Sequence, residues 1–103
     1  MHLIEIFVPL PSGDAEHDGH SAVRRIVRDL TERFGGATAF TRTPAEGLWK
    51  DGDKGEVERD DIVVIEVMAE DLDRGWWTQF RERLETELEQ DEILIRTTEC
   101  ERI

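Results

Sequence analysis

The distribution of apolar and polar positions along the chain predicts two central β-strands. The longest apolar run, Asp61 to Ala69, is rich in β-branched residues and contains one internal charge, Glu66. That pattern is typical of a strand buried on both faces. Leu3 to Val8 alternates instead, with isoleucine or valine at every second position. Pro9 to Gly13 predicts the end of this first strand, because proline cannot donate a hydrogen bond to a neighbouring strand.

Helical spacing of apolar residues first appears between residues 22 and 34. The apolar positions that repeat at this spacing are Val23, Ile26, Val27, Leu30 and Phe34. Ser21 is the candidate N-cap, since its hydroxyl can accept a hydrogen bond from a free backbone N–H. Gly35–Gly36 is expected to end the helix, because glycine readily adopts the left-handed conformation.

A second helix is expected to begin after Asp71 or Asp73 and to run to about Gln90. Its apolar side chains fall within one arc of the helix surface and comprise Trp76, Trp77, Phe80, Leu84 and Leu88. We interpret the two tryptophans as residues of the core and its edge, since aromatic pairs at this spacing are usually packing residues.

Three further segments complete the predicted elements. Ala37 to Thr43 is a weaker strand that ends at Pro44. Glu46 to Gly55 is interpreted as a long hairpin leading into the central strand, which starts as early as Val57. The last strand is expected from Glu92 to about Cys100.

The predicted order is strand, helix, strand, strand, helix, strand. This is the split βαβ pattern of an α+β, ferredoxin-like fold, here a single domain spanning residues 1–103. Right-handed connections place the first and third strands in the middle of a four-stranded antiparallel sheet. Both helices then cover one face of the sheet and leave the other face open.

The charge and composition of the chain exclude some classes of partner. The chain has 25 acidic and 13 basic residues, a net charge of −12. Such a charge repels nucleic acid and anionic membranes, so neither is an expected partner. The N-terminal run lacks a basic segment and contains Glu5, which argues against a signal peptide, and no stretch approaches the roughly twenty apolar residues of a membrane span. With one cysteine, Cys100, we expect a cytoplasmic protein.

The open face of the predicted sheet is unusually apolar. Strand alternation assigns to it Leu3, Glu5, Phe7, Ile62, Val64, Glu66, Met68, Leu94, Arg96, Thr98 and Cys100. A contiguous apolar patch of this kind usually marks a binding surface. We therefore predict a homo-oligomer, most simply a two-fold dimer packed sheet to sheet, with Phe7, Val64 and Met68 in the interface or in a ligand site.

Three charged residues on that face are the candidate functional group. Glu5 and Glu66 would lie on adjacent central strands, with Arg96 on the strand beside Glu5. One interpretation is a small polar site, in which the glutamates act as acid and base or anchor a charged ligand. The alternative is a salt-bridge network across the dimer, in which Arg96 pairs with one or both glutamates.

Other candidate residues carry weaker patterns. His17 and His20 are three residues apart and could reach one metal ion if their loop became helical, while the alternative is a solvated loop. Trp49 lies in a glycine-flanked hairpin, where it can contact a neighbouring subunit or close over a pocket. Cys100 is interpreted as an inert strand residue. No glycine-rich phosphate loop follows a strand, so no cofactor is expected.

The βαββαβ order resembles the large ferredoxin-like group over nearly the whole chain. Within that group, the dimeric α+β-barrel proteins include small monooxygenases and isomerases, and the resemblance implies paired open faces that enclose a pocket. The P-II-like and divalent-ion-tolerance proteins form trimers and carry a long second hairpin, as Glu46 to Val57 suggests here. The resemblance thus implies a dimer, with a trimer as the alternative.

Three functional hypotheses follow from the sequence. The first is an oligomeric module that binds a small molecule or a protein partner. The second is a small enzyme with Glu5, Glu66 and Arg96 in a pocket. The third is a cation-binding protein that uses His17 and His20.

Overall fold

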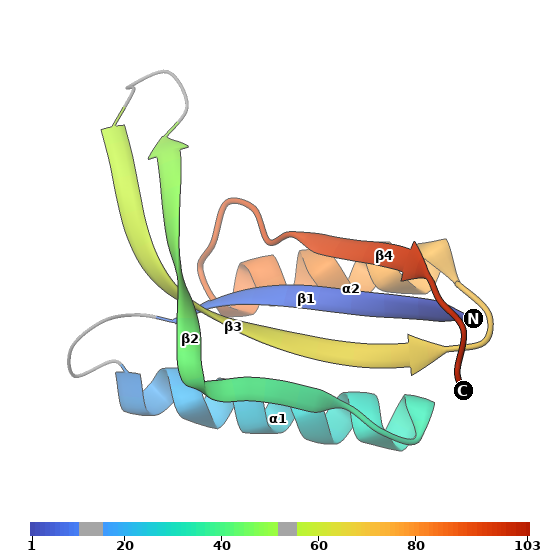
Figure 1. Ribbon diagram of the computed structural model, residues 1–103. Coiled ribbons are helices and arrows are strands. Elements are labelled where there is room, and N and C mark those ends of the chain that lie inside the picture. Colours follow the sequence, from blue (N-terminus) through green and yellow to red (C-terminus); the bar gives the residue numbers. More distant parts are fainter. Residues whose placement is uncertain (11–15, 52–55) are drawn as a thin grey trace.

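The computed structural model describes the backbone of residues 1–10, 16–51 and 56–103, and the side chains of residues 1–10, 20–41 and 62–103. The elements are β1 (His2–Leu10), α1 (Glu16–Phe34), β2 (Thr38–Asp51), β3 (Glu56–Ala69), α2 (Arg74–Glu87) and β4 (Ile95–Glu99) (Figure 1). The strands form one antiparallel sheet in the order β2-β3-β1-β4. This confirms the predicted ferredoxin-like fold, with β1 and β3 in the middle.

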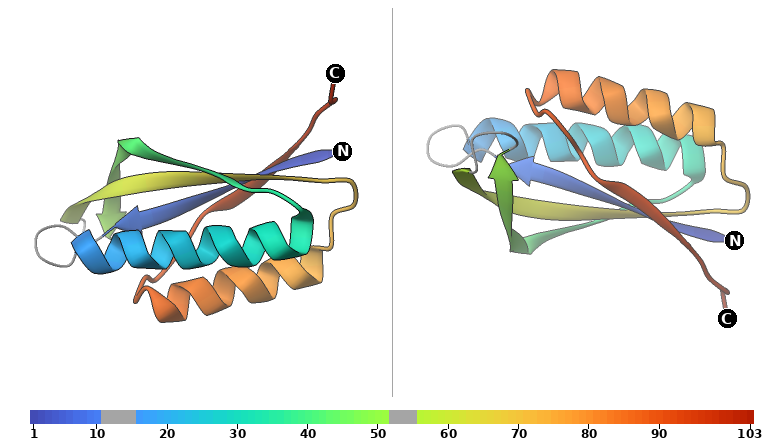
Figure 2. Two further views of the ribbon diagram at one scale, coloured as in Figure 1. Left: turned by 90° about the horizontal axis from the view of Figure 1, so that it is seen from below. Right: turned by 90° about the horizontal axis from the view of Figure 1, so that it is seen from above.

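Both helices cover the same face of the sheet, as predicted (Figure 2). Alternate residues of the central strands point toward the helices and are buried. The main buried side chains are Ile4, Ile6 and Val8 of β1, Val63, Ile65 and Val67 of β3, Val23, Ile26 and Leu30 of α1, and Trp77, Phe80 and Leu84 of α2. Ile93, just before β4, is buried with them, whereas Ile95 is half-buried at the edge of this core.

Helix α1 begins at Glu16, six residues before the predicted start at Ala22. Ser21 therefore lies inside the helix and is not its N-cap; its hydroxyl accepts a hydrogen bond of 3.4 Å from Arg24. The segment before Ala22 contains no proline, and a single glycine costs only about 1 kcal/mol in a helix, so helical hydrogen bonding continues through it. The predicted end is confirmed, with Gly35 at a φ of +84°.

Helix α2 begins where the sequence predicted. The Asp73 side chain caps the helix by accepting a hydrogen bond of 3.1 Å from the backbone N–H of Trp76. The helix ends at Glu87, three residues before the predicted end at Gln90.

Strand β4 is shorter than predicted, because its predicted first residues belong to the connection from α2. The backbone N–H of Ile93 donates to a carboxylate oxygen of Glu85 at 2.9 Å, and it is therefore directed to the helix rather than to a strand. Regular pairing with β1 begins at Ile95, although the Leu94 carbonyl already accepts a hydrogen bond of 3.0 Å from Phe7.

The β2–β3 hairpin is long, as predicted, but β2 does not stop at Thr43. It continues to Asp51, and its pairing with β3 is interrupted by an irregularity between Phe40 and Ala45. At this point the hairpin turns sharply away from the rest of the sheet (Figure 1). Pro44 thus lies at an irregularity inside the strand, where a missing backbone donor is tolerated.

Ile62 is a second difference in this region. The sequence assigned it to the open face, but only 5% of it is exposed. It pairs with Ala45, the first residue beyond the irregularity in β2. Ile62 is absent from the buried cluster between the sheet and the helices, whereas its neighbour Val63 belongs to it, so the alternation of faces holds and only the exposure of Ile62 differs from the expectation.

Neither helix, within the described residues, combines the length and apolar character that crossing a bilayer requires.

Candidate functional site

A row of four residues, one from each strand, crosses the open face of the sheet. Thr38 of β2 lies opposite Glu66 of β3, which lies opposite Glu5 of β1, which in turn lies opposite Arg96 of β4. Directly opposed residues on one face have Cβ atoms about 5 Å apart, so each side chain in the row neighbours the next. The row brings together the three charged residues that the sequence singled out.

Arg96 is held by two neighbours on the open face. Its Nε donates to a carboxylate oxygen of Glu5 at 2.9 Å, and its guanidinium carbon lies 4.9 Å from the centre of the Phe7 ring. The Glu5 side chain is 16% exposed and that of Arg96 58% exposed. Because the arginine is largely solvated, this ion pair contributes little to stability by itself and mainly fixes the orientation of Glu5.

Glu66 differs from Glu5 in having no such partner. Among the described residues, no hydrogen bond or ion pair is formed by its side chain. Glu66 as a residue is half-buried and lies next to Glu5, whose own charge is already paired with Arg96. Glu66 is therefore the group in the row that is available to a ligand or to a second subunit.

Apolar side chains surround this charged row. The exposed members are Phe40 at 47%, Met68 at 41% and Leu94 at 44%, and the half-buried ones are Leu3, Phe7 and Val64. Together they form a patch that one subunit leaves uncovered, which is typical of a binding or assembly surface.

Of the remaining sequence candidates, the structure describes the side chains of His20 and Cys100, and neither belongs to this row. The side chains of His17 and Trp49 lie outside the described residues. His20 is half-buried on α1, and the described part of the chain holds no group of three or more metal-binding side chains. Cys100 is half-buried, and its backbone N–H donates to the Met1 carbonyl at 3.0 Å.

Trp76 and Trp77 pack as predicted. Trp77 stacks on Phe34 with ring centres 5.2 Å apart, and Trp76 stacks on Phe80 with ring centres 5.1 Å apart. The contact between Trp77 and Phe34 joins the C-terminal end of α1 to α2. The aromatic cluster is part of the packing between the helices rather than a binding site.

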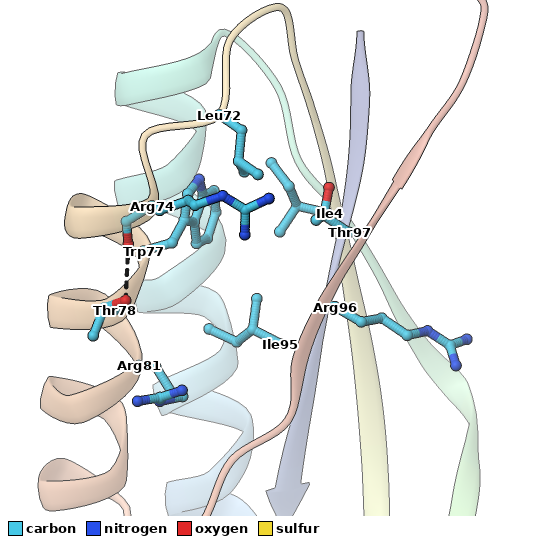
Figure 3. A pocket seen from close by; sticks show the side chains of 9 residues that line it. All are labelled: Ile4, Leu72, Arg74, Trp77, Thr78, Arg81, Ile95, Arg96 and Thr97. Carbon is cyan, nitrogen blue, oxygen red and sulfur yellow. Dashed lines mark hydrogen bonds between the residues drawn. The ribbon is translucent and has the colours of Figure 1, made fainter.

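The sequence did not predict a groove between α2 and β4 on the helix-covered side of the sheet. Its volume is about 190 Å³. Its lining residues are Ile4, Leu72, Arg74, Trp77, Thr78, Arg81, Ile95, Arg96 and Thr97 (Figure 3). The available signal was the spacing of Arg74 and Arg81, which are seven residues apart and therefore share one face of the helix.

Comparison with known proteins gives a fold-level relationship. No family model matches the chain, and no curated protein matches it. Among solved structures, a phage SAM lyase in complex with S-methyl-5′-thioadenosine is similar, with a TM-score of 0.66, 18% identity, and 95% of this chain and 80% of that chain covered. A phage SAM lyase in the apo state is also similar, with a TM-score of 0.62, 18% identity, and 94% of this chain and 78% of that chain covered. At this identity the likeness establishes the fold alone.

Proposed function

We propose that this protein is a homo-oligomeric module that binds a small organic cation on the open face of its sheet. The observation that carries the proposal is that Glu66, a half-buried residue, has no side-chain partner among the described residues and lies beside the ion-paired Glu5. A carboxylate that loses part of its hydration without a compensating partner favours binding of a positive charge.

The surroundings of Glu66 favour an organic cation over a bare metal ion. Val64 and Met68 flank Glu66 on the same face of β3, and Phe40 and Phe7 present aromatic rings nearby. Aromatic rings attract cations through their negative faces and also stack on planar groups. The net charge of −12 adds a general attraction for positively charged ligands.

S-adenosylmethionine has both features, a positive sulfonium centre and an aromatic purine. The similar phage lyase was solved with S-methyl-5′-thioadenosine, which has the purine but no sulfonium charge. The two compounds are therefore a matched pair of probes for the charged and the apolar parts of the proposed site.

Isothermal titration calorimetry with both compounds tests the proposal. We expect S-adenosylmethionine to bind, and Glu66→Gln to weaken its affinity about tenfold, because hydrogen bonds to charged groups typically contribute about 1.5–3 kcal/mol. The same variant should leave the affinity for neutral S-methyl-5′-thioadenosine nearly unchanged. Glu82→Gln is the control, since it removes one negative charge at an exposed position of α2.

Equal weakening by Glu66→Gln and Glu82→Gln would mean that only net charge matters, and it would contradict a site at Glu66. Absence of heat with both compounds at millimolar concentration would reject these two ligands. Native mass spectrometry of the protein purified gently from cells then reports whether another small molecule is retained.

A second candidate is an enzyme that uses the same carboxylates. It is supported by the direct opposition of Glu5 and Glu66 across β1 and β3, and by the fold shared with a lyase. One carboxylate could accept a proton while the other stabilises developing positive charge.

Incubation with S-adenosylmethionine separates the enzyme from the binding module. If a carboxylate removes a proton from the carbon next to the sulfur-bound carbon of the methionine portion, the C–H electrons form a C=C bond and the C–S electron pair goes to sulfur. Neutral S-methyl-5′-thioadenosine and 2-aminobut-3-enoate are then released, and chromatography with mass detection measures both. An enzyme should release S-methyl-5′-thioadenosine faster than buffer does, and Glu66→Gln should lower that rate at least 100-fold. If S-adenosylmethionine binds but S-methyl-5′-thioadenosine is released no faster than in buffer, the enzyme is rejected and the binding module stands.

The cytoplasm remains the proposed location. The support for it is the single cysteine, which fits a reducing compartment.

A further inference from the structure

The groove between α2 and β4 has a composition that is unexpected in this chain. The protein carries 25 acidic residues, yet the lining of the groove contains three arginines and no aspartate or glutamate. The guanidinium of Arg96 lies on the opposite side of the sheet, where it pairs with Glu5 (Figure 3). Arg74 and Arg81 are therefore the charged groups that the groove itself presents.

The charges of these two arginines are poorly compensated. Arg74 forms no ion pair or side-chain hydrogen bond with another described residue. Arg81 approaches Glu85 at 3.9 Å, at the outer limit of an ion pair. Its side chain is 42% exposed, but its Nε is buried and has no hydrogen-bond partner among the described residues. A buried donor without an acceptor is costly, and an anion in the groove would remove that cost.

The groove is also lined by an apolar residue at its base and by hydroxyl groups at its sides. Trp77, which is 6% exposed, lies on α2 between the two arginines. Thr97 projects from β4 on the helix-covered side, and Thr78 lies beside Trp77 on α2 (Figure 3). Figure 3 also shows Arg74 extending from the helix across the groove toward β4. Arg74 thus reaches across the groove from α2 while the Thr97 hydroxyl lies on the β4 side, and Arg81 lies farther along α2 with its guanidinium directed away from Arg74 (Figure 3).

We propose that this groove binds a small phosphate group, either as inorganic phosphate or as the head of a small phosphate monoester. Guanidinium groups bind phosphate oxygens with paired, charge-assisted hydrogen bonds, and the Arg81 Nε supplies a donor that lacks a partner. The groove volume of about 190 Å³ is below the roughly 300–1,000 Å³ of pockets for larger ligands, so a phosphate-sized group fits better than a whole nucleotide.

Titration with inorganic phosphate, followed by two-dimensional amide NMR, tests this site. Ionic strength is held constant with sodium chloride, so that general screening does not change during the titration. We expect the signals of Arg74, Thr78, Thr97 and the Trp77 indole N–H to shift together and to saturate. The signals of Glu66 and Val64, on the other face of the sheet, should stay in place. A parallel titration with glycerol 3-phosphate tests the monoester.

Four variants assign the effect to the groove. Arg74→Met and Arg81→Met should each weaken phosphate affinity about tenfold, since each removes charge-assisted hydrogen bonds. Arg83→Met is the control, because Arg83 lies on the same helix, bridges to Glu87 and does not line the groove. Arg81→Lys keeps the charge but lacks the planar fork, so it should also bind more weakly while the protein stays folded.

Equal weakening by all three methionine variants would show that only net charge matters and would overturn the proposal. Shifts that appear equally with chloride, or that spread over the surface without saturating, would mean an adventitious ion only. Tighter binding of the monoester than of inorganic phosphate would identify a phosphorylated metabolite, and the reverse order would identify the free anion; both support the site. The groove and Glu66 lie on opposite faces of the sheet, so either proposal can fail while the other stands.

Discussion

Glu5 and Glu66 are the same residue type at directly opposed positions, yet their environments differ. Glu5 is 16% exposed and is fixed by Arg96 at 2.9 Å. Glu66 is half-buried and has no partner among the described residues. A paired carboxylate has its charge satisfied, whereas an unpaired one retains acceptor capacity. This difference is why the proposed function places the ligand at Glu66 and gives Glu5 only an orienting role.

Leu84 tests the packing of the core at the level of one residue. It is 1% exposed on α2 and belongs to the buried cluster against the sheet. Leu84→Ala should lower the free energy of unfolding by about 2–5 kcal/mol, because it removes buried methyl groups and leaves a cavity. Urea denaturation measures the change. Glu82→Ala, two residues away at an exposed position, should stay within about 0.5 kcal/mol of the unchanged protein. A loss below 1 kcal/mol for Leu84→Ala would contradict the assigned helix face.

At the scale of whole elements, the strands of the sheet were predictable because their signal repeats. Alternation from Leu3 to Val8 and from Ile62 to Ala69 fixes which residues share a face, and most of that assignment is confirmed. Asp73 was predictable as one of two candidate caps, because it directly precedes the apolar positions that mark the helix. The start of α1 was not predictable, because Ser21 is a good N-cap residue that here lies inside a longer helix.

One part of the candidate site was likewise predictable from the sequence, and another part was not. The row from Glu66 to Arg96 follows from strand order and side-chain alternation, both of which the sequence carries. Glu5 is the partner of Arg96 because β1 lies between β3 and β4, so Glu66 is one strand farther from Arg96. The groove depends on the spacing between α2 and β4, which is influenced by the hydrogen bond from the Ile93 N–H to Glu85. That tertiary contact has no sequence signature.

For the molecule as a whole, the sheet separates two surfaces of different chemistry. One face is apolar and carries the row Glu66, Glu5 and Arg96. The other is covered by the helices and presents Arg74 and Arg81 in a groove without acidic residues. The net charge of −12 therefore does not predict the charge that a ligand meets at either surface. Local pairing and burial decide which charges a ligand meets.

The apolar open face leads to a prediction about assembly. We expect two subunits packed sheet to sheet, because that arrangement would cover Phe40, Met68 and Leu94. In a two-fold interface each substitution occurs twice, so Met68→Glu places two new charges in it. Native mass spectrometry should find two subunits for the unchanged protein and mainly one for Met68→Glu, with circular dichroism unchanged.

Gln79→Glu provides the matched control for this experiment. It adds the same charge at an exposed position of α2, on the helical side of the molecule, and should leave the dimer intact. If the unchanged protein has three subunits and Met68→Glu separates them, the same face forms a trimer interface instead. A monomer for the unchanged protein at micromolar concentration, or a dimer that survives Met68→Glu, would reject the open face as the assembly surface. In either of those cases the apolar patch around Glu66 would be left to a ligand alone.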